Sequence, residues 1–116
     1  MALVLPATHP ATNTFQVVSG DVYSQPARIG IINIMPRLEE YEPSLLGPLS
    51  RLERHVEPVF IRLESHGYGS SDRQHLDRFY QPFSRVVADL PLDGLILTGA
   101  PVEELAFQDV RYWPEL

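Results

Sequence analysis

The sequence predicts an α/β fold built on a parallel sheet, because three apolar runs alternate with two helical stretches. The apolar runs cover residues 28–34, 56–63 and 93–98, and they are rich in branched aliphatic side chains. Helical patterns lie between them, at 39–54 and from residue 71 onward. This β-α-β-α-β order predicts parallel strands joined by right-handed crossovers. It corresponds to half of a doubly wound α/β domain.

The first 27 residues differ in composition from the rest of the chain. Residues 1–27 are rich in Pro, Thr, Ser and Ala and show little periodicity. We predict that they form an extended N-terminal arm, in which residues 15–18 are able to pair as a short strand. Residues 28–116 are then the N-terminal part of the α/β domain.

The three predicted strands differ in how they are buried. The runs 28–34 and 93–98 are almost continuously apolar, as is typical of parallel strands covered on both faces. The run 56–63 carries Pro58 near its start, a position that a strand tolerates at its beginning or on a sheet edge.

Leucines at helical spacing mark the first helix, predicted over 39–54. They are Leu45, Leu46, Leu49 and Leu52. Pro43 suits the first turn of such a helix, whereas Pro48 predicts a kink. In the second helical stretch, Ser71 followed by Gln74 resembles a capping box, and apolar residues within 76–83 share one face until Pro82.

Composition excludes several classes of function. The 116 residues carry a net charge of −6, and all nine basic residues are scattered arginines, which argues against nucleic-acid binding. No apolar run approaches the roughly 20 residues of a membrane span, and the start lacks the pattern of a secretory signal. We therefore expect a cytoplasmic protein. The chain has no cysteine, which excludes disulfides, thiolate metal sites and a cysteine nucleophile within it.

Chemistry in a parallel sheet is expected at the carboxyl ends of its strands. Three segments meet there in the predicted fold: Met35-Pro36-Arg37, residues 64–67, and residues 98–101. The Gly99-Ala100-Pro101 loop is consistent with an oxyanion hole, because glycine lets backbone N–H groups face outward. On spacing alone, a simple tight turn is the more common explanation, because Gly and Pro occur in most loops.

Other polar residues allow more than one interpretation. Glu39, Glu40 and Glu42 are able to hold a cation or a substrate ammonium group, or to stabilise a helix N-terminus. The histidines at positions 9, 55, 66 and 75 lie far apart and match no metal-binding spacing. We therefore predict no metal site, and we interpret His75 as a packing or surface residue.

Several blocks in the right order identify a resemblance to a known family. The segments 31–36 (IINIMP) with Glu40 and Glu42, 75–80 (HLDRFY) and 93–103 (DGLILTGAPVE) resemble the homoserine O-acyltransferases of methionine biosynthesis. Matching aromatic and apolar positions continue through 107–113, so the resemblance extends from about residue 28 to residue 116.

The resemblance implies a flavodoxin-like fold similar to class I glutamine amidotransferases, and transfer of an acyl group from acyl-CoA to L-homoserine by way of a cysteine. No other cofactor is implied. The family's cysteine, histidine and glutamate catalysts have no counterpart in this chain, so we expect it to be inactive alone. Gly99, Ala100 and Pro101 correspond to the loop beside the nucleophile. Glu103 corresponds to the position where glutamate accompanies acetyl-CoA and glycine accompanies succinyl-CoA.

Departures from the family pattern leave alternatives open. Family members often have lysine where Arg37 and Leu38 stand, and this chain has no lysine. L-Serine is therefore an alternative acceptor, and a non-catalytic binding module is an alternative function. A nucleotide-binding half-flavodoxin fits less well, because no G-x-G-x-x-G follows the first strand. For the complete enzyme we expect a homodimer, with further polypeptide or a second chain covering the sheet.

Overall fold

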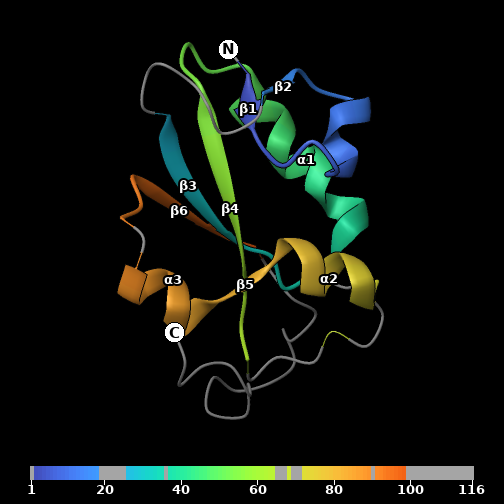
Figure 1. Cartoon of the computed structure of the whole chain (residues 1–116), viewed down its shortest axis with the longest axis vertical. Helices are drawn as coiled ribbons and strands as arrows, with labels where there is room; N and C mark the ends of the chain where they lie inside the picture. Colours follow the sequence, from blue (N-terminus) through green and yellow to red (C-terminus); the bar gives the residue numbers. More distant parts are fainter. Residues whose placement is uncertain are drawn as a thin grey trace.

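A computed structural model describes residues 2–18, 26–35, 37–64, 68, 72–89 and 91–98. Within these residues the chain forms an α/β fold with an all-parallel sheet, as predicted. The strand order is β2-β1-β4-β3-β6, and β5 pairs with the far end of β4 (Figure 1). No helix in the described part of the chain is long and apolar enough to cross a membrane.

The three predicted strands lie side by side in this sheet. They are β3 (Ala27–Ile32), β4 (Val56–Arg62) and β6 (Gly94–Leu97). β3 lies between the other two and pairs with β4 over its whole length. Pro58 lies within β4 opposite Ile29. The Val56 N–H donates to the Ala2 carbonyl on the side of β4 that faces away from β3. Because successive backbone nitrogens of a strand face alternate sides, the nitrogen of Pro58, which carries no hydrogen, faces that same side.

Residues 2–18 are part of the packed fold, so the prediction of a mostly extended arm is wrong for them. β1 (Leu3–Val4) and β2 (Val17–Val18) join the sheet, and a 3-10 helix (Pro10–Asn13) lies between them. The apolar residues 2–5 are all buried, because β1 covers the open side of β4 at its start. The short strand expected within 15–18 is confirmed as β2.

The helices cover both faces of the sheet. α1 (Leu38–Ser50), the 3-10 helix and α2 (Arg73–Phe79) pack on one face, and α3 (Phe83–Asp89) packs on the other (Figure 1). Alternation along the strands separates the two cores: Ile31 and Phe60 face α1, whereas Ile32 and Ile61 face α3. Each core is therefore formed by one face of the strands and the helices that cover it.

Details of the helices differ from the sequence-based prediction. α1 begins at Leu38, so Pro43 lies in its second turn rather than its first, and the helix ends at Ser50. The N-cap of α2 is Asp72 rather than Ser71, and its carboxylate accepts hydrogen bonds from the N–H groups of Gln74 and His75. After α2 the chain forms β5 (Gln81–Pro82) and then α3, two elements that sequence periodicity did not indicate.

We predicted that the strands at 28–34 and 93–98 are buried on both faces, and this holds for β3 only. In β6, Leu95 and Leu97 remain 54% and 50% exposed on the face that α3 covers elsewhere. β6 is an edge strand of the described sheet, and α3 is only seven residues long. The sequence also predicts a short helical stretch at 109–116, which lies outside the described residues.

Candidate functional site

The ends of β3 and β6 lie side by side, where the sequence predicted a functional edge. The Thr98 N–H donates to the carbonyl of Ile32 at 3.0 Å, and the Ile34 N–H donates to Thr98 Oγ1 at 2.9 Å. These two bonds fix the turn that follows β3 against the end of β6. They therefore bring the predicted segments 35–37 and 98–101 together, and Thr98 is the part of the second segment that the structure describes.

Only some of the predicted site residues can be placed at this edge. Met35 is half-buried, and Arg37 is exposed at the start of α1. Arg37 has φ 49° and ψ 55°, a left-handed conformation that is strained for a residue with a side chain. Pro36, Gly99, Ala100, Pro101 and Glu103 lie outside the described residues.

Asn33 organises the same turn from inside the protein. Its amide Nδ2 donates to the Leu38 carbonyl at 3.1 Å and to the Tyr80 hydroxyl at 3.2 Å, and its Oδ1 accepts from the Met35 N–H at 3.2 Å. Burial raises the pKa of Tyr80 far above its ordinary value of 10.0, and the charge of Glu42 raises it further, although the Asn33 hydrogen bond lowers it. Tyr80 is therefore a neutral hydroxyl at physiological pH.

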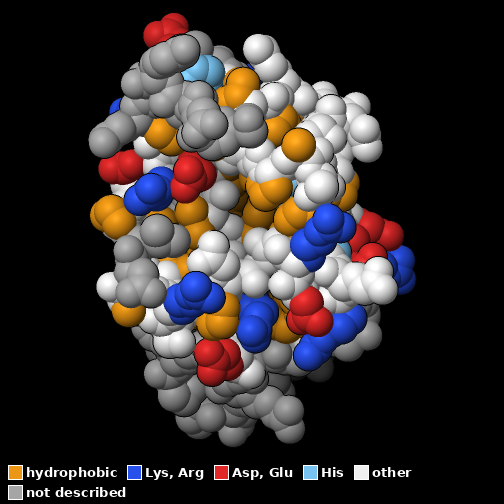
Figure 2. Space-filling view, viewed as in Figure 1, with side chains coloured by type: hydrophobic (Ala, Val, Ile, Leu, Met, Phe, Trp, Pro, Cys, Tyr) orange, Lys and Arg blue, Asp and Glu red, His pale blue; other side chains and the backbone are white. Residues whose placement is uncertain are grey.

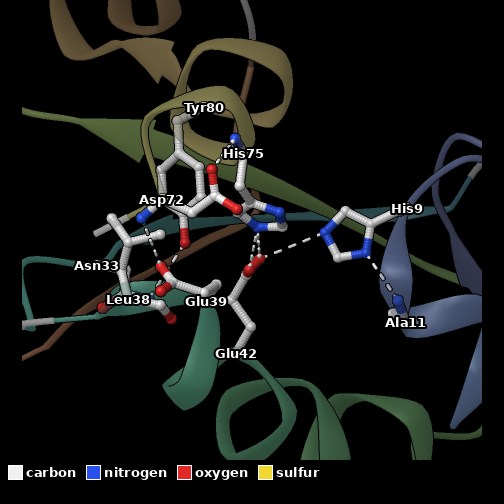
Figure 3. Close-up of polar contacts among 9 residues, drawn as sticks. All are labelled: His9, Ala11, Asn33, Leu38, Glu39, Glu42, Asp72, His75 and Tyr80. Atoms are coloured by element: carbon white, nitrogen blue, oxygen red, sulfur yellow. Dashed lines mark hydrogen bonds and ion pairs between the residues drawn. The ribbon is translucent and has the colours of Figure 1, made fainter. Parts of the chain in front are cut away.

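A second group of polar side chains is buried between α1, α2 and the N-terminal segment, and its centre is Glu42 (Figure 3). Glu42 lies one turn from both Leu38 and Leu46, and all three side chains are buried on the same face of α1. Glu39 and Glu40 occupy the first turn of the helix, as the N-terminal interpretation predicts. Glu42 instead points inward and is only 3% exposed.

His75 contacts Glu42 closely from α2. Its Nε2 lies 2.7 Å from each carboxylate oxygen of Glu42. Burial lowers the pKa of His75, but the hydrogen bond and charge of Glu42, together with the charges of Glu39 and Asp72, outweigh this effect and raise the pKa above 6.5. The Glu42 carboxylate therefore favours the protonated form of the His75 imidazole.

His9 approaches the same carboxylate from the N-terminal segment. Its Nδ1 accepts a hydrogen bond from the Ala11 N–H at 3.0 Å, which caps the 3-10 helix. Because Nδ1 is an acceptor, the proton of the neutral ring is assigned to Nε2. Nε2 lies 3.3 Å from Glu42 Oε1 but is not aligned for a hydrogen bond, so this buried nitrogen has no hydrogen-bond partner among the described residues.

Aromatic rings surround His9 and His75. The His9 ring stacks on Phe60 with an interplanar angle of 3°, and Phe79 contacts both imidazoles at centroid distances of 4.6 and 4.9 Å. On the other side, Glu42 and both histidines line a cavity of about 320 Å³, together with Glu39 and Asp72. The cluster thus lies between aromatic side chains on one side and a cavity lined by carboxylates on the other.

The His9, Glu42 and His75 ligand atoms lie within 4.8 Å of one another, close enough to hold a metal ion. Histidine spacing did not reveal this group, because its members come from three separate elements. One sequence signal did exist: Glu42 interrupts the Leu38–Leu46 face of α1 at i, i+4, i+8 spacing. A charged residue on an apolar helix face indicates a buried partner.

A second cavity, of about 400 Å³, lies along the outer edge of β4 between β1 and β5. Apolar side chains gather across the middle of the face shown in Figure 2, with charged side chains around them. The cavity is lined by Val4, Pro58, Phe60 and Phe79, with Arg78 and Glu57 among its polar residues. His9 lines this cavity as well as the first one.

Comparison with known proteins identifies the family. Residues 16–116 match the family model described as homoserine O-succinyltransferase. The chain is 39% identical over 125 residues to a homoserine O-acetyltransferase of Brevibacillus brevis and 35% identical over 127 residues to one of Clostridium novyi. Each alignment covers 100% of this chain but only 40% and 41% of the relatives, so the chain spans about two fifths of their length. The chain belongs to the homoserine O-acyltransferase family.

Proposed function

We propose that this chain forms the N-terminal part of a homoserine O-acyltransferase that acetylates L-homoserine in methionine biosynthesis. The match of residues 16–116 to the family carries this proposal, because it includes all three strand-end segments of the predicted site. The two relatives above are homoserine O-acetyltransferases by name, which supports acetyl-CoA as the donor.

The geometry at the strand ends is consistent with such a site. Thr98 holds the end of β6 beside the turn after β3, through its bonds with Ile32 and Ile34. The strained backbone of Arg37 lies in the same turn, and strain of this kind is often concentrated at functional sites. In our proposal, Gly99 and Ala100 lie beside the nucleophile and contribute a backbone N–H to the oxyanion site, whereas Pro101, which has no N–H, belongs to the same loop without donating.

The proposed chemistry requires a nucleophile from outside these 116 residues, which contain no cysteine. A cysteine thiolate attacks the thioester carbonyl of acetyl-CoA, and the CoA thiolate leaves. The hydroxyl of L-homoserine then attacks the acyl-cysteine, gives its proton to a general base, and the thiolate is regenerated. The N–H groups of this chain stabilise the oxyanion in both steps.

The complete enzyme is proposed to have a flavodoxin-like fold of the class I glutamine amidotransferase type. In that form, further polypeptide or a second chain of a homodimer covers the part of the sheet where Leu95 and Leu97 are exposed. The division into an N-terminal segment and an α/β part at residues 27 and 28 stays a prediction.

A chimera tests the proposed function directly. Residues 1–116 replace the aligned segment of the Brevibacillus brevis homoserine O-acetyltransferase, and the product is assayed with acetyl-CoA and L-homoserine. We expect acyl transfer by the chimera and none by the 116-residue chain alone. L-Serine is assayed in parallel, because Arg37 and Leu38 depart from the family pattern. A folded chimera that acylates neither acceptor would favour a non-catalytic binding module.

Donor choice in the chimera is predicted to depend on Glu103. A carboxylate at this position fills space and repels the free carboxylate of a succinyl group. Glu103→Gly should therefore shift the ratio of kcat/KM values towards succinyl-CoA by roughly 10- to 100-fold. Glu104→Gly is the matched control, since it removes the neighbouring carboxylate with the same backbone change. Equal shifts in both variants would contradict a specific role for Glu103.

A further inference from the structure

We propose that His9, Glu42 and His75 form a binding site for a divalent metal ion of the zinc class, which fastens the N-terminal segment to α1 and α2. The three side chains come from three elements that are distant in sequence, and they converge on one point (Figure 3). The family match begins at residue 16, so His9 lies outside it. Glu42 and His75 lie within that match, and the metal site is a proposal separate from the acyltransfer activity.

The donor set fits this class of metal. Two imidazole nitrogens and one carboxylate are a common ligand set of zinc, with a fourth position left for water or substrate. Ligands of a tetrahedral zinc ion lie roughly 3.3 Å apart. The distance from His9 Nε2 to Glu42 Oε1 is 3.3 Å, whereas His75 Nε2 is 2.7 Å from Glu42 and would move slightly outward.

Two observations besides the cluster itself indicate a ligand. His9 is only 2% exposed, yet its Nε2 has no hydrogen-bond partner among the described residues and points toward Glu42. Buried polar atoms without a partner are rare, and a metal ion would satisfy this nitrogen. In addition, all three ligands line one side of the 320 Å³ cavity, which leaves room for a fourth ligand.

The surroundings favour a cation. Glu39 and Asp72 line the same cavity and add negative charge to that of Glu42. Behind the ligands, Phe60 and Phe79 pack against the imidazoles and exclude water. A divalent ion would be attracted by these carboxylates and would be held in a site of low local dielectric constant.

Metal binding must change the hydrogen bonding of His9. In this structure, Nδ1 of His9 accepts a hydrogen bond from the Ala11 N–H. Once Nε2 of a neutral imidazole binds a metal ion, the ring proton resides on Nδ1, so the Ala11 N–H loses its acceptor. The site therefore predicts a change in the environment of the Ala11 amide on metal binding.

The test uses the chimera with the Brevibacillus brevis enzyme, which supplies the rest of the polypeptide. It is treated with a chelator and then titrated with Zn²⁺ and with Co²⁺. We expect one metal ion per chain and the visible absorption of tetrahedral Co²⁺. Nuclear magnetic resonance should show a shift of the Ala11 amide. Absence of stoichiometric binding would overturn the proposal.

A matched pair of variants assigns the site. His9→Asn removes Nε2 but places an amide oxygen near the position of Nδ1, so the cap on Ala11 is preserved. His55→Asn is the control, because His55 Nδ1 similarly accepts from the Ala2 N–H but lies outside the cluster. His9→Asn should weaken Zn²⁺ binding by at least about 100-fold, and His55→Asn should leave it unchanged.

Glu42→Gln tests the carboxylate separately and should also weaken binding by at least about 100-fold. Circular dichroism establishes whether each variant is folded. If Glu42→Gln does not fold, the result for His9→Asn alone decides whether the metal site exists. Binding that His9→Asn retains, or that His55→Asn loses equally, would be adventitious and would overturn the assignment.

Discussion

Asn33 shows how a single buried residue holds the predicted functional edge in place. Its side chain is fully buried, yet its Nδ2 and Oδ1 together bond to the Leu38 carbonyl, the Tyr80 hydroxyl and the Met35 N–H. These partners come from the turn after β3, from α1 and from the residue after α2. The amide therefore links the strand end to both helices on that face of the sheet.

Replacement of Asn33 should be considerably more costly than replacement of Tyr80. Asn33→Ala leaves polar groups without partners in the interior and should lower the free energy of unfolding by about 2–4 kcal/mol. Tyr80→Phe removes one hydrogen bond, while Asn33 Nδ2 keeps the Leu38 carbonyl, so its cost should be about 1 kcal/mol. Urea unfolding of the two variants measures the difference. Similar costs would show that Asn33 does not organise the turn.

At the residue scale, the sequence predicted the strand-end segments but not the buried cluster. The strand ends followed from Pro36 and from Gly99, which punctuate apolar runs. His9 and His75 are 66 positions apart, and only the fold brings them to Glu42. Convergence of this kind depends on tertiary packing and leaves no local spacing to detect.

At the scale of elements, α1 carries two prolines within its 13 residues. Pro43 and Pro48 both lie beyond the first turn, where a proline removes a backbone hydrogen bond and crowds the preceding turn. The helix nevertheless forms, because Leu38 and Leu46 are buried against the sheet. Packing thus outweighs an unfavourable local sequence in this element.

Pro48→Ala should stabilise the chain. Proline costs a helix interior about 3 kcal/mol, and roughly 1 kcal/mol of that is returned because proline also restricts the unfolded chain. The expected gain in unfolding free energy is therefore about 2 kcal/mol, measured from the urea midpoint at constant slope. Pro48 is exposed, so no core contact is lost. A variant no more stable than the original would mean that the helix has fully adapted to the ring.

Among the elements, long apolar runs were predicted well and short ones poorly. β3, β4 and β6 lie within one or two residues of their predicted bounds, because branched aliphatic runs bounded by turn residues are a strong signal. β1, β2 and β5 contain only two residues each, too few for any periodicity. α3 follows α2 after only three residues, so one continuous helical pattern concealed two helices and a strand between them.

At the scale of the whole molecule, the sheet is well covered in its centre and poorly covered at β6. β1 and β2 extend the sheet beyond β4, and residues 2–5 complete the core on that side. On the opposite side, Leu95 and Leu97 of the edge strand are about half exposed. Exposed apolar side chains on an edge strand favour association with another chain or segment.

The 116-residue chain alone is therefore expected to be marginally stable and prone to self-association. Sedimentation should show oligomers or aggregates, and a hydrophobic dye should bind at the exposed face of β6. Leu95→Thr combined with Leu97→Thr should reduce both effects, since threonine preserves strand propensity while removing apolar surface. Leu52→Thr is the control, because Leu52 is 44% exposed but lies outside the sheet. A monomer that unfolds cooperatively without binding dye would show that β6 needs no cover.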